Sequence, residues 1–225
     1  MTAEIISVGT ELLLGNILNT NAQYLSQELN ALGIGVCYHT VVGDNPQRVR
    51  RAVDIARQRA DIIITTGGLG PTLDDLTKET IAKAMGDVIV ENPDCMQYLK
   101  ENYARAGRTM TPNNLKQAYM PSRAIVLPND AGTAPGFALE QDGKLIIAMP
   151  GPPREMTRMF ELQVKPLLQK RQDSVIYYRM LRMFGIGESS LETVLLPLID
   201  GQTDPTLATY AKEGECSLRI ASKRA

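Results

Sequence analysis

Short apolar runs alternate with amphipathic stretches through the first half of the chain. Three such runs are predicted to be strands: Glu4–Val8, Ile34–Val42 and Ile62–Thr65. The β-branched run Ile62–Ile64 in the third is typical of a strand buried on both faces. After each strand, apolar residues recur every three or four positions, which predicts helices starting near Thr20, after Asn45-Pro46 and at Thr77. Strand–helix alternation of this kind is typical of a parallel sheet with crossover helices, so we expect an α/β fold.

The second half continues this pattern and then changes character. Helices are expected at Pro93–Arg105 and Arg154–Gln169, strands at Ser122–Leu127 and Lys144–Met149, and a hairpin turn at Asp142-Gly143. The last part of the chain is predicted to be a small α+β unit. It consists of a strand (Ser174–Met183), a helix after Gly187 and a hairpin of Thr206–Ala211 with Cys216–Ala221 that turns at Glu213-Gly214. We therefore predict two domains, residues 1–171 and 172–225.

Composition excludes several classes of function. The 225 residues carry 24 Lys plus Arg against 25 Asp plus Glu, so the chain has no general attraction for nucleic acid or a membrane surface. No apolar run is long enough for a membrane span, and the start lacks the features of a signal peptide. Three scattered cysteines (Cys37, Cys95, Cys216) fit neither a disulfide scaffold nor a zinc site, and we expect reduced thiols and a cytoplasmic location. The single histidine, His39, is interpreted as structural, since no nucleophile elbow accompanies it.

The stretch Asp61–Thr80 combines features of a phosphate site and a metal site. Its glycines Gly67, Gly68 and Gly70 let backbone N–H groups approach a ligand closely. Two acids, Asp74 and Asp75, follow, and they would repel a phosphate unless a divalent cation lay between them. The spacing is neither a P-loop nor a dinucleotide fingerprint. Two interpretations stay open: a metal-assisted phosphoryl or nucleotidyl site, or a tight turn in which Asp75 caps the following helix.

Polar residues follow each of the first three predicted strands. Because ligands bind beyond the carboxyl ends of parallel strands, we expect these residues to share one cleft: Thr10, Glu11, Asn19, Asn21, Asp44, Asp74 and Asp75. The loop after the first strand also holds Leu12, Leu13, Leu14 and Ile17, which favours burial against a ligand or a second subunit.

A further junction, Pro150–Glu155, leads from a strand into a helix at the same end of the predicted sheet. Gly151 permits close approach, and Glu155 adds a carboxylate. A plain strand-to-helix connection with proline stops is the alternative interpretation.

These segments together resemble the CinA family of competence/damage-inducible proteins. The resemblance rests on V-G-T-E-L-L-L-G (8–15), N-T-N (19–21), V-G-D (42–44), T-G-G-L-G-P-T-L-D-D-L-T (66–77), N-L-K-Q-A (114–118), G-T-A-P-G (132–136) and P-G-P-P-R-E-M (150–156). The first 170 or so residues also resemble the molybdopterin-binding fold of the MoaB/Mog type.

The resemblance implies a three-layer α/β sandwich with a mostly parallel sheet, assembled as a homo-oligomer that we expect to be a dimer. It further implies hydrolysis of ADP-ribose to AMP and ribose 5-phosphate, dependent on a divalent metal (Mg²⁺, Mn²⁺ or Co²⁺) and helped by potassium. By position, Asp44 and Asp75 correspond to the acids that serve nucleotidyl transfer in Mog-type relatives. The family usually carries a nicotinamide-nucleotide amidase domain that this sequence lacks, and because Ala225 directly follows a strand, we expect the natural chain to continue.

The resulting hypothesis is a metal-dependent nucleotide pyrophosphatase acting on ADP-ribose. Asp44, Asp74 and Asp75 are the expected catalytic residues, and Asp75, Asp74 and Glu11 the expected metal ligands. Substrate binding is assigned to Thr10, Glu11, Asn19, Asn21, Gly67, Gly68, Gly70, Thr72, Lys116, Gly132, Gly151, Pro152 and Glu155. Molybdopterin binding or adenylylation in the same pocket, and a non-catalytic nucleotide-binding regulator, stay as alternatives.

Overall fold

The computed structural model describes residues 1–171, 175–212 and 214–224. Contacts divide the chain into a first unit, Met1–Leu29 with Ile34–Lys170, and a second unit, which comprises the C-terminal residues from Arg171 together with Asn30–Gly33. Among the described residues, no helix is long and apolar enough to cross a membrane.

The first unit is built around one six-stranded sheet. The strands are β1 (Thr2–Val8), β2 (Gly35–Val42), β3 (Ile62–Thr66), β6 (Ile125–Leu127), β7 (Gly136–Gln141) and β8 (Lys144–Met149), in the order β2-β1-β3-β8-β7-β6. Strands β2, β1, β3 and β8 run parallel, whereas β7 pairs antiparallel with both β8 and β6. The predicted α/β fold with a mostly parallel sheet is confirmed.

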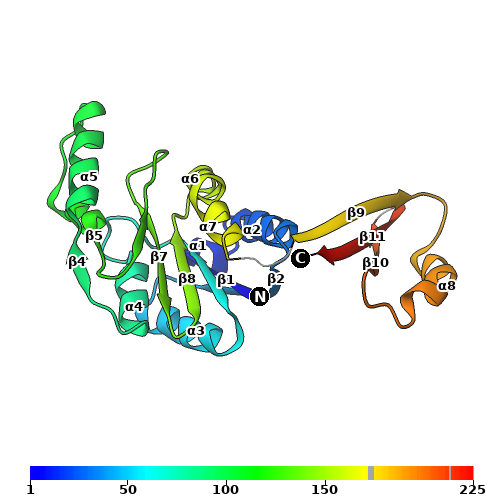
Figure 1. Ribbon diagram of the computed structural model, residues 1–225. Coiled ribbons are helices and arrows are strands. Elements are labelled where there is room, and N and C mark those ends of the chain that lie inside the picture. Colours follow the sequence, from blue (N-terminus) through cyan, green and yellow to red (C-terminus); the bar gives the residue numbers. More distant parts are fainter. Residues whose placement is uncertain (172–174, 213, 225) are drawn as a thin grey trace. The chain divides into compact units, whose positions relative to one another are not determined.

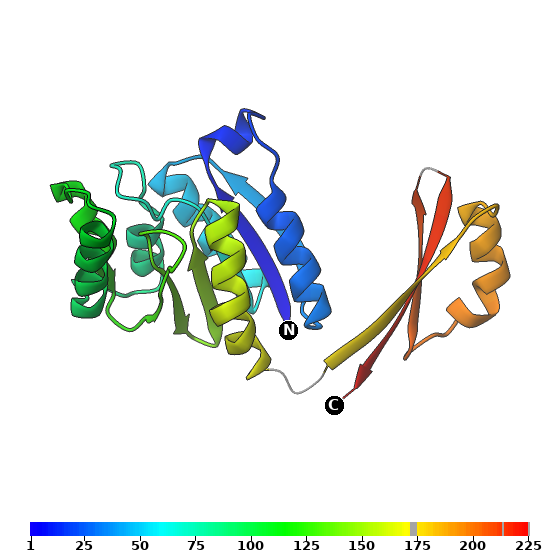
Figure 2. The ribbon, with the colours of Figure 1, turned by 90° about the horizontal axis from the view of Figure 1, so that it is seen from above.

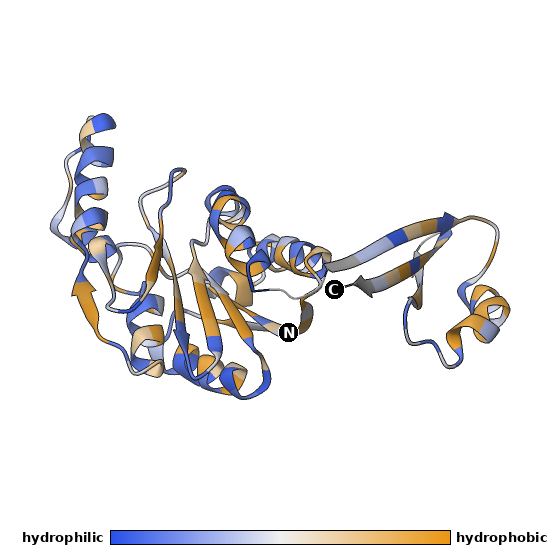
Figure 3. Cartoon of the chain, viewed as in Figure 1, coloured by the Kyte–Doolittle hydropathy of each residue, from blue (hydrophilic) through white to orange (hydrophobic). Residues whose placement is uncertain are grey.

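Helices cover both faces of this sheet, which makes three layers (Figures 1 and 2). The helical segments are α1 (Thr10–Leu13), α2 (Thr20–Ala31), α3 (Pro46–Arg59), α4 (Thr77–Ala84), α5 (Pro93–Arg105), η1 (Pro112–Ala118), α6 (Pro153–Met159), η2 (Phe160–Val164) and α7 (Lys165–Gln169). On one face, α2 contacts η2, where the Tyr24 ring meets the Phe160 ring edge-on with centroids 5.9 Å apart. On the other face, α3 packs against α4 and the strands. Apolar residues concentrate in the central strands (Figure 3).

Several helix starts follow from local chemistry. The side chains of Asn45 and Asn92 accept hydrogen bonds from the N–H groups of Arg48 and Cys95, each at 3.0 Å, and a proline occupies the first helical position of α3 and α5. At the β7–β8 hairpin, Asp142 and Gly143 both have positive φ, 52° and 72°, as the Asp-Gly signal predicts. These predictions are confirmed.

Two local expectations were wrong, and a third needs a refinement. The predicted helix Arg154–Gln169 is helical throughout (α6, η2 and α7), but its middle segment, η2, is π-helical and ends two residues before Pro166. Proline has no N–H to donate to the preceding turn and clashes with its carbonyl, so the helix widens there. The expected loop after β1 contains the short helix α1, and the expected strand Ser122–Leu127 is reduced to β6, Ile125–Leu127. In addition, β4 (Ile89–Glu91) and β5 (Tyr119–Pro121) form a two-stranded sheet that was not predicted.

The second unit contains a three-stranded antiparallel sheet and one helix. Strands β9 (Val175–Met183), β10 (Thr206–Lys212) and β11 (Glu215–Arg224) lie in the order β10-β11-β9, and α8 (Glu188–Ile199) packs against β10. Of the α8 side chains, Leu191 is buried, whereas Val194 and Leu198 are exposed. The predicted strand start at Ser174 and the turn residue Glu213 lie outside the described residues.

Candidate active site

A cavity of about 420 Å³ lies where the parallel strands of the first unit end. Most of its lining residues lie at or just after the carboxyl ends of four strands: Val8, Gly9 and Glu11 at the end of β1, Asp44 after β2, Gly67, Gly68, Leu69, Gly70, Pro71, Asp74 and Asp75 after β3, and Pro150, Gly151, Pro152 and Glu155 after β8. Gln117, Thr133 and Ala134 complete the wall. A larger groove of about 690 Å³ lies along α6 and η2, and the predicted site residues are not among those that line it. The smaller cavity therefore defines the candidate site.

The glycine loop after β3 is tightly constrained by its neighbours. Gly67 and Gly68 have positive φ, 98° and 68°, and a Cβ atom would lie 2.1 Å from the Val8 carbonyl oxygen and 2.0 Å from Thr77 Oγ1, respectively. The Gly67 N–H donates to the carbonyl of Met149 at 3.1 Å, so that amide is engaged by the sheet. Within the described part of the chain, the N–H groups of Gly68, Leu69 and Gly70 have no acceptor. Those three donors are available to an anion.

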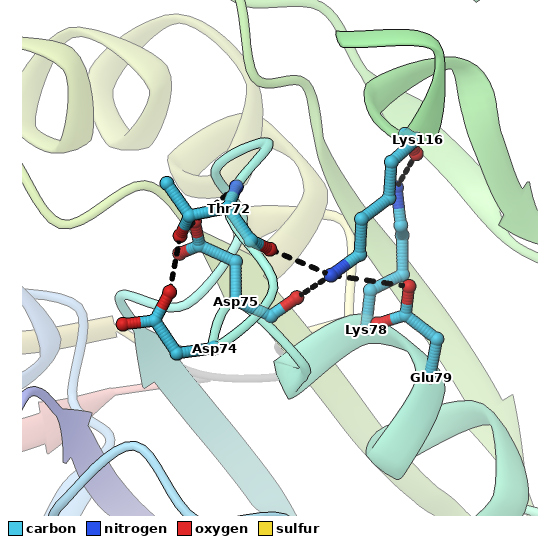
Figure 4. A network of polar contacts seen from close by, with 6 residues as sticks. All are labelled: Thr72, Asp74, Asp75, Lys78, Glu79 and Lys116. Carbon is cyan, nitrogen blue, oxygen red and sulfur yellow. Dashed lines mark hydrogen bonds and ion pairs between the residues drawn. The ribbon is translucent and has the colours of Figure 1, made fainter. Parts of the chain in front are cut away.

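The acid pair is organised by one threonine (Figure 4). The Thr72 hydroxyl lies 2.5 Å from Asp74 Oδ1 and also contacts Asp75 Oδ2, while the Thr72 N–H donates to Asp75 Oδ2 at 3.0 Å. The hydrogen bond from the Thr72 hydroxyl holds the pKa of Asp74 below its ordinary value. Helix α4 begins after Leu76 without a side-chain cap, so the interpretation of Asp75 as a helix cap is wrong. Asp75 instead closes the loop onto Thr72.

Lys116 binds the backbone of the loop that carries Asp74 and Asp75, here called the acid loop. Its ammonium donates to the carbonyl oxygens of Thr72, at 3.2 Å, and of Asp75, and it lies 3.7 Å from Glu79 Oε1 (Figure 4). Lys116 does not line the cavity, so its contacts differ from the substrate contact predicted for it. The neighbouring Lys78 is buried and donates to the Lys116 carbonyl at 2.8 Å, and burial lowers the pKa of Lys78 to about 8. Lys116 therefore holds the loop that carries the acids, and Lys78 binds the backbone at Lys116.

Asp44 and Thr10 bind each other across the ends of β1 and β2. Asp44 Oδ2 accepts hydrogen bonds from the N–H and the hydroxyl of Thr10, both at 2.8 Å. Thr10 is the first residue of α1, so the carboxylate also accepts a hydrogen bond from one of the N–H groups that have no partner within the helix at that start. Glu11 lies in the cavity wall, with its carboxylate folded against Gly9, where a Cβ atom would be 2.6 Å from Oε1.

The two predicted asparagines support the site and do not line this cavity. Asn19 exchanges hydrogen bonds with the buried Ser7 hydroxyl, at 3.0 and 3.3 Å. The buried Asn21 donates from Nδ2 to the carbonyl of Gly151 at 2.7 Å. Asn21 thereby fixes the proline-rich turn after β8. Pro152 and Pro153 have no N–H, and the N–H groups of Glu155 and Met156 donate to the Pro152 carbonyl.

Glu155 lines the cavity, and its carboxylate is held there by contacts that were not predicted from the sequence. Its carboxylate packs on Gly132, where a Cβ atom would lie 2.1 Å from Oε2, and it accepts a hydrogen bond from Asn129 Nδ2 at 2.6 Å. Asn129 is buried, and its carbonyl accepts from the Tyr98 hydroxyl. Asn129, Gln117 and Thr133 were missed, although Gln117 and Thr133 stand beside the predicted Lys116 and Gly132 in two of the motifs.

The single histidine lies apart from this site. His39 is exposed on the edge strand β2, and its Nε2 is 2.8 Å from the Ser26 hydroxyl oxygen.

The donor set fits a hard divalent cation only in part. Among the described residues, no three His, Cys, Asp or Glu side chains gather closely enough to hold a metal by themselves, so Asp74, Asp75 and Glu11 do not form the predicted three-acid group. Asp74 and Asp75 still converge on Thr72 and offer carboxylate oxygens to the cavity. Mg²⁺ is commonly held by one or two carboxylates together with substrate phosphates and water, and the acid pair fits that mode.

Comparisons with known proteins agree with this architecture. Residues 4–170 match the family described as "Probable molybdopterin binding domain", and residues 178–225 match the "Damage-inducible protein CinA KH domain". A CinA-like protein of Dictyoglomus turgidum is 53% identical over 223 residues, which cover 99% of this chain and 54% of that protein. The chain thus spans about half the length of the curated relatives it matches.

Solved structures place the fold in the same group. The crystal structure of the protein CinA from Thermoplasma acidophilum is 35% identical, with a TM-score of 0.69, and the match covers 74% of this chain and 97% of that one. A molybdopterin biosynthesis protein from Mycobacterium abscessus is 16% identical with a TM-score of 0.51, covering 76% and 92%, which shows the fold alone. The chain therefore belongs to the CinA family, with a domain of the molybdopterin-binding type followed by a CinA-type KH domain.

Proposed function

We propose that this cavity hydrolyses the pyrophosphate bond of a nucleotide, with ADP-ribose as the substrate and AMP and ribose 5-phosphate as the products. The observation that carries the proposal is that free backbone N–H groups of the glycine loop and the carboxylates of Asp44, Asp74 and Asp75 line one cavity. Amide donors suit phosphate oxygens, whereas carboxylates suit a divalent cation and an attacking water.

The glycine loop binds the substrate in this mechanism. The N–H groups of Gly68, Leu69 and Gly70 donate to phosphate oxygens and stabilise the charge that develops during attack. Asp74 and Asp75 would hold a divalent cation, which would supply positive charge to neutralise the two phosphates. Thr72 and Lys116 keep the two acids in place through the contacts described above.

Asp44 acts on the water. Its Oδ2 is anchored by two hydrogen bonds from Thr10, which fixes the orientation of the carboxylate and leaves Oδ1 to accept a proton. Water attacks one phosphorus, the bond from that phosphorus to the bridging oxygen breaks, and the proton lost by the water passes to Asp44. The bridging oxygen leaves with the other phosphate.

A second candidate function is molybdopterin binding or adenylylation in the same cavity. The specific observation in its favour is the match of residues 4–170 to a family described by molybdopterin binding. A pterin that copurifies with the protein, identified by its fluorescence after oxidation, supports this candidate. A non-catalytic nucleotide-binding role is the third alternative, and nucleotide binding without turnover in the presence of metal supports it.

The deciding experiment is a hydrolysis screen of ADP-ribose and other nucleotide sugars with Mg²⁺, Mn²⁺ or Co²⁺, with and without K⁺. We expect AMP and ribose 5-phosphate in equal amounts, with release abolished by exhaustive chelation and restored by added metal. Full activity after chelation contradicts the metal-dependent mechanism, and no turnover with any metal contradicts the proposed activity.

A further inference from the structure

One part of the cavity wall has no part in the chemistry proposed above. Gln117 on η1 and Thr133 in the loop before β7 both line the cavity, and Gln117 is 2% exposed. Gln117 Nε2 donates to Thr133 Oγ1 at 3.2 Å. Gln117 Oε1 is buried, and no hydrogen-bond partner for it exists among the described residues.

An unpartnered carboxamide oxygen in this position is unfavourable for the folded protein. Buried polar atoms are nearly always hydrogen-bonded, because they lose their bonds to water on folding. Rotating the carboxamide by 180° would bond its oxygen to the Thr133 hydroxyl and leave the amine without a partner. In either orientation, one polar end of Gln117, which is a residue of the cavity wall, lacks a partner among the described residues.

A ligand hydroxyl group matches this pair better than a base does. A hydroxyl can donate to Gln117 Oε1 and accept from Thr133, and it can equally accept from the amine if the carboxamide is rotated. Within the described part of the chain, no aromatic side chain lines the cavity, so a flat base would find no ring on which to stack. Ala134, the neighbour of Thr133, is small and leaves room beside the pair.

We propose that Gln117 and Thr133 form a subsite that binds a sugar hydroxyl of the substrate. The inference rests on the proposed function for the identity of the sugar, a ribose of ADP-ribose. It makes Gln117 a specificity-determining residue, which discriminates a phosphorylated sugar from inorganic phosphate.

The test measures binding without turnover. Calorimetric titrations with Mg²⁺ present use four probes: AMP, 2′,3′-dideoxy-AMP, ribose 5-phosphate and inorganic phosphate. Gln117→Met keeps the length of the side chain and removes its polar end. We expect it to weaken binding of AMP or ribose 5-phosphate about tenfold, the effect of one lost hydrogen bond, and to leave dideoxy-AMP and inorganic phosphate unchanged.

Two further variants keep the test decisive. Thr133→Val removes the hydroxyl with little change in shape, and it should weaken the same probe even if Gln117→Met folds poorly. Gln97→Met is the matched control, since Gln97 is exposed on α5 and bonds Glu101 at 2.7 Å. An unchanged affinity for every probe, or an equal loss for all four, overturns the subsite. Failure of the proposed function is seen separately, as absence of ADP-ribose turnover by the wild-type protein.

Discussion

At the scale of single residues, the site depends on a few short polar contacts. Thr72 gathers Asp74 and Asp75, Thr10 anchors Asp44, and Lys116 binds the carbonyls of the acid loop. Because each contact has its own donor and acceptor, changing one side chain is expected to affect chemistry and stability in separable ways.

Asp75→Asn tests the role of the charge. Asparagine keeps an oxygen that can accept from the Thr72 N–H, so we expect the thermal midpoint to change little. Turnover of ADP-ribose should fall by about two to three orders of magnitude, because charge stabilisation by a bound metal is worth several kcal/mol. Steady-state rates and thermal melts of the same preparations give both readouts.

Two comparison variants accompany it. Asp142→Asn changes an exposed acid in the β7–β8 turn and should leave turnover unchanged. Asp44→Asn should lose turnover while metal titration stays close to wild type, because Asp44 acts on the water. Turnover of Asp75→Asn near the wild-type rate would remove the support for a catalytic role.

The buried Lys78 ammonium leads us to expect stability to rise at alkaline pH. Burial lowers its pKa to about 8 from the ordinary value of 10.5, so the folded state loses this proton at lower pH than the unfolded state does. Between these two pKa values the unfolded chain binds more protons, and the free energy of unfolding therefore rises with pH. From pH 7 to 9.5 this one group contributes about 2 kcal/mol.

Urea unfolding of the wild-type protein and of Lys78→Met at both pH values measures this effect. The stability advantage of the wild-type protein over the variant should be smaller at pH 7 than at pH 9.5, or even change sign, since the charged buried lysine is unfavourable at pH 7. Lys83→Met, an exposed lysine on the same helix, is the control and should follow the wild-type pH dependence. Parallel pH curves for the wild-type protein and Lys78→Met contradict the prediction.

At the scale of elements, the junction of β3 and α4 depends on glycines that admit no side chain. Gly68 combines a positive φ with a close approach to Thr77, whose buried hydroxyl has no hydrogen-bond partner among the described residues. The loop can therefore reach from the sheet to the helix only with glycine at this position.

Comparing Gly68→Ala with Gly15→Ala separates the cost of a positive φ from the cost of the contact with Thr77. Gly15 has nearly the same φ, 71° against 68°, but nothing lies within 4 Å of the position that a Cβ atom would take there. Gly15→Ala should lower the free energy of unfolding by about 1 kcal/mol, the cost of a left-handed conformation. Gly68→Ala should cost at least about 2 kcal/mol more, because Thr77 must also move. If chemical denaturation shows the same loss of unfolding free energy for both variants, the contact with Thr77 costs nothing and the prediction is wrong.

At the scale of the whole molecule, the first unit exposes apolar side chains beside the site. Leu13, Leu14, Ile17 and Leu18 are 53%, 69%, 53% and 85% exposed. Exposed apolar side chains grouped in one segment commonly mark an interface. We keep the prediction of a homodimer or larger assembly, with this segment near the interface or the ligand.

Light scattering at micromolar concentration tests the association, and Leu14→Glu should shift the protein toward the monomer. Ile55→Glu on α3 is the matched control, since Ile55 is also exposed but lies outside the segment. A wild-type protein that is strictly monomeric would refute the prediction, as would equal dissociation by both variants.

The sequence by itself determined most of the strands of the main sheet, most helix limits and the end of the sheet at which polar loops gather. Apolar periodicity, asparagine–proline caps and an Asp-Gly turn act within a few residues, so they can be interpreted without knowing the fold. The same local signals placed Gly67, Gly68, Asp44 and Asp75 near one site. They could not show the partner of each side chain.

Only the tertiary structure decided those partners. Lys116 lies behind the acid loop and not in the cavity, Asn21 supports the Gly151 turn, and Gln117 enters the wall with one polar end unpartnered among the described residues. Each of these outcomes joins residues about 16 to 130 positions apart in the chain. Such contacts depend on how strands and helices pack, and packing is set by the burial of the whole core, which no local pattern encodes.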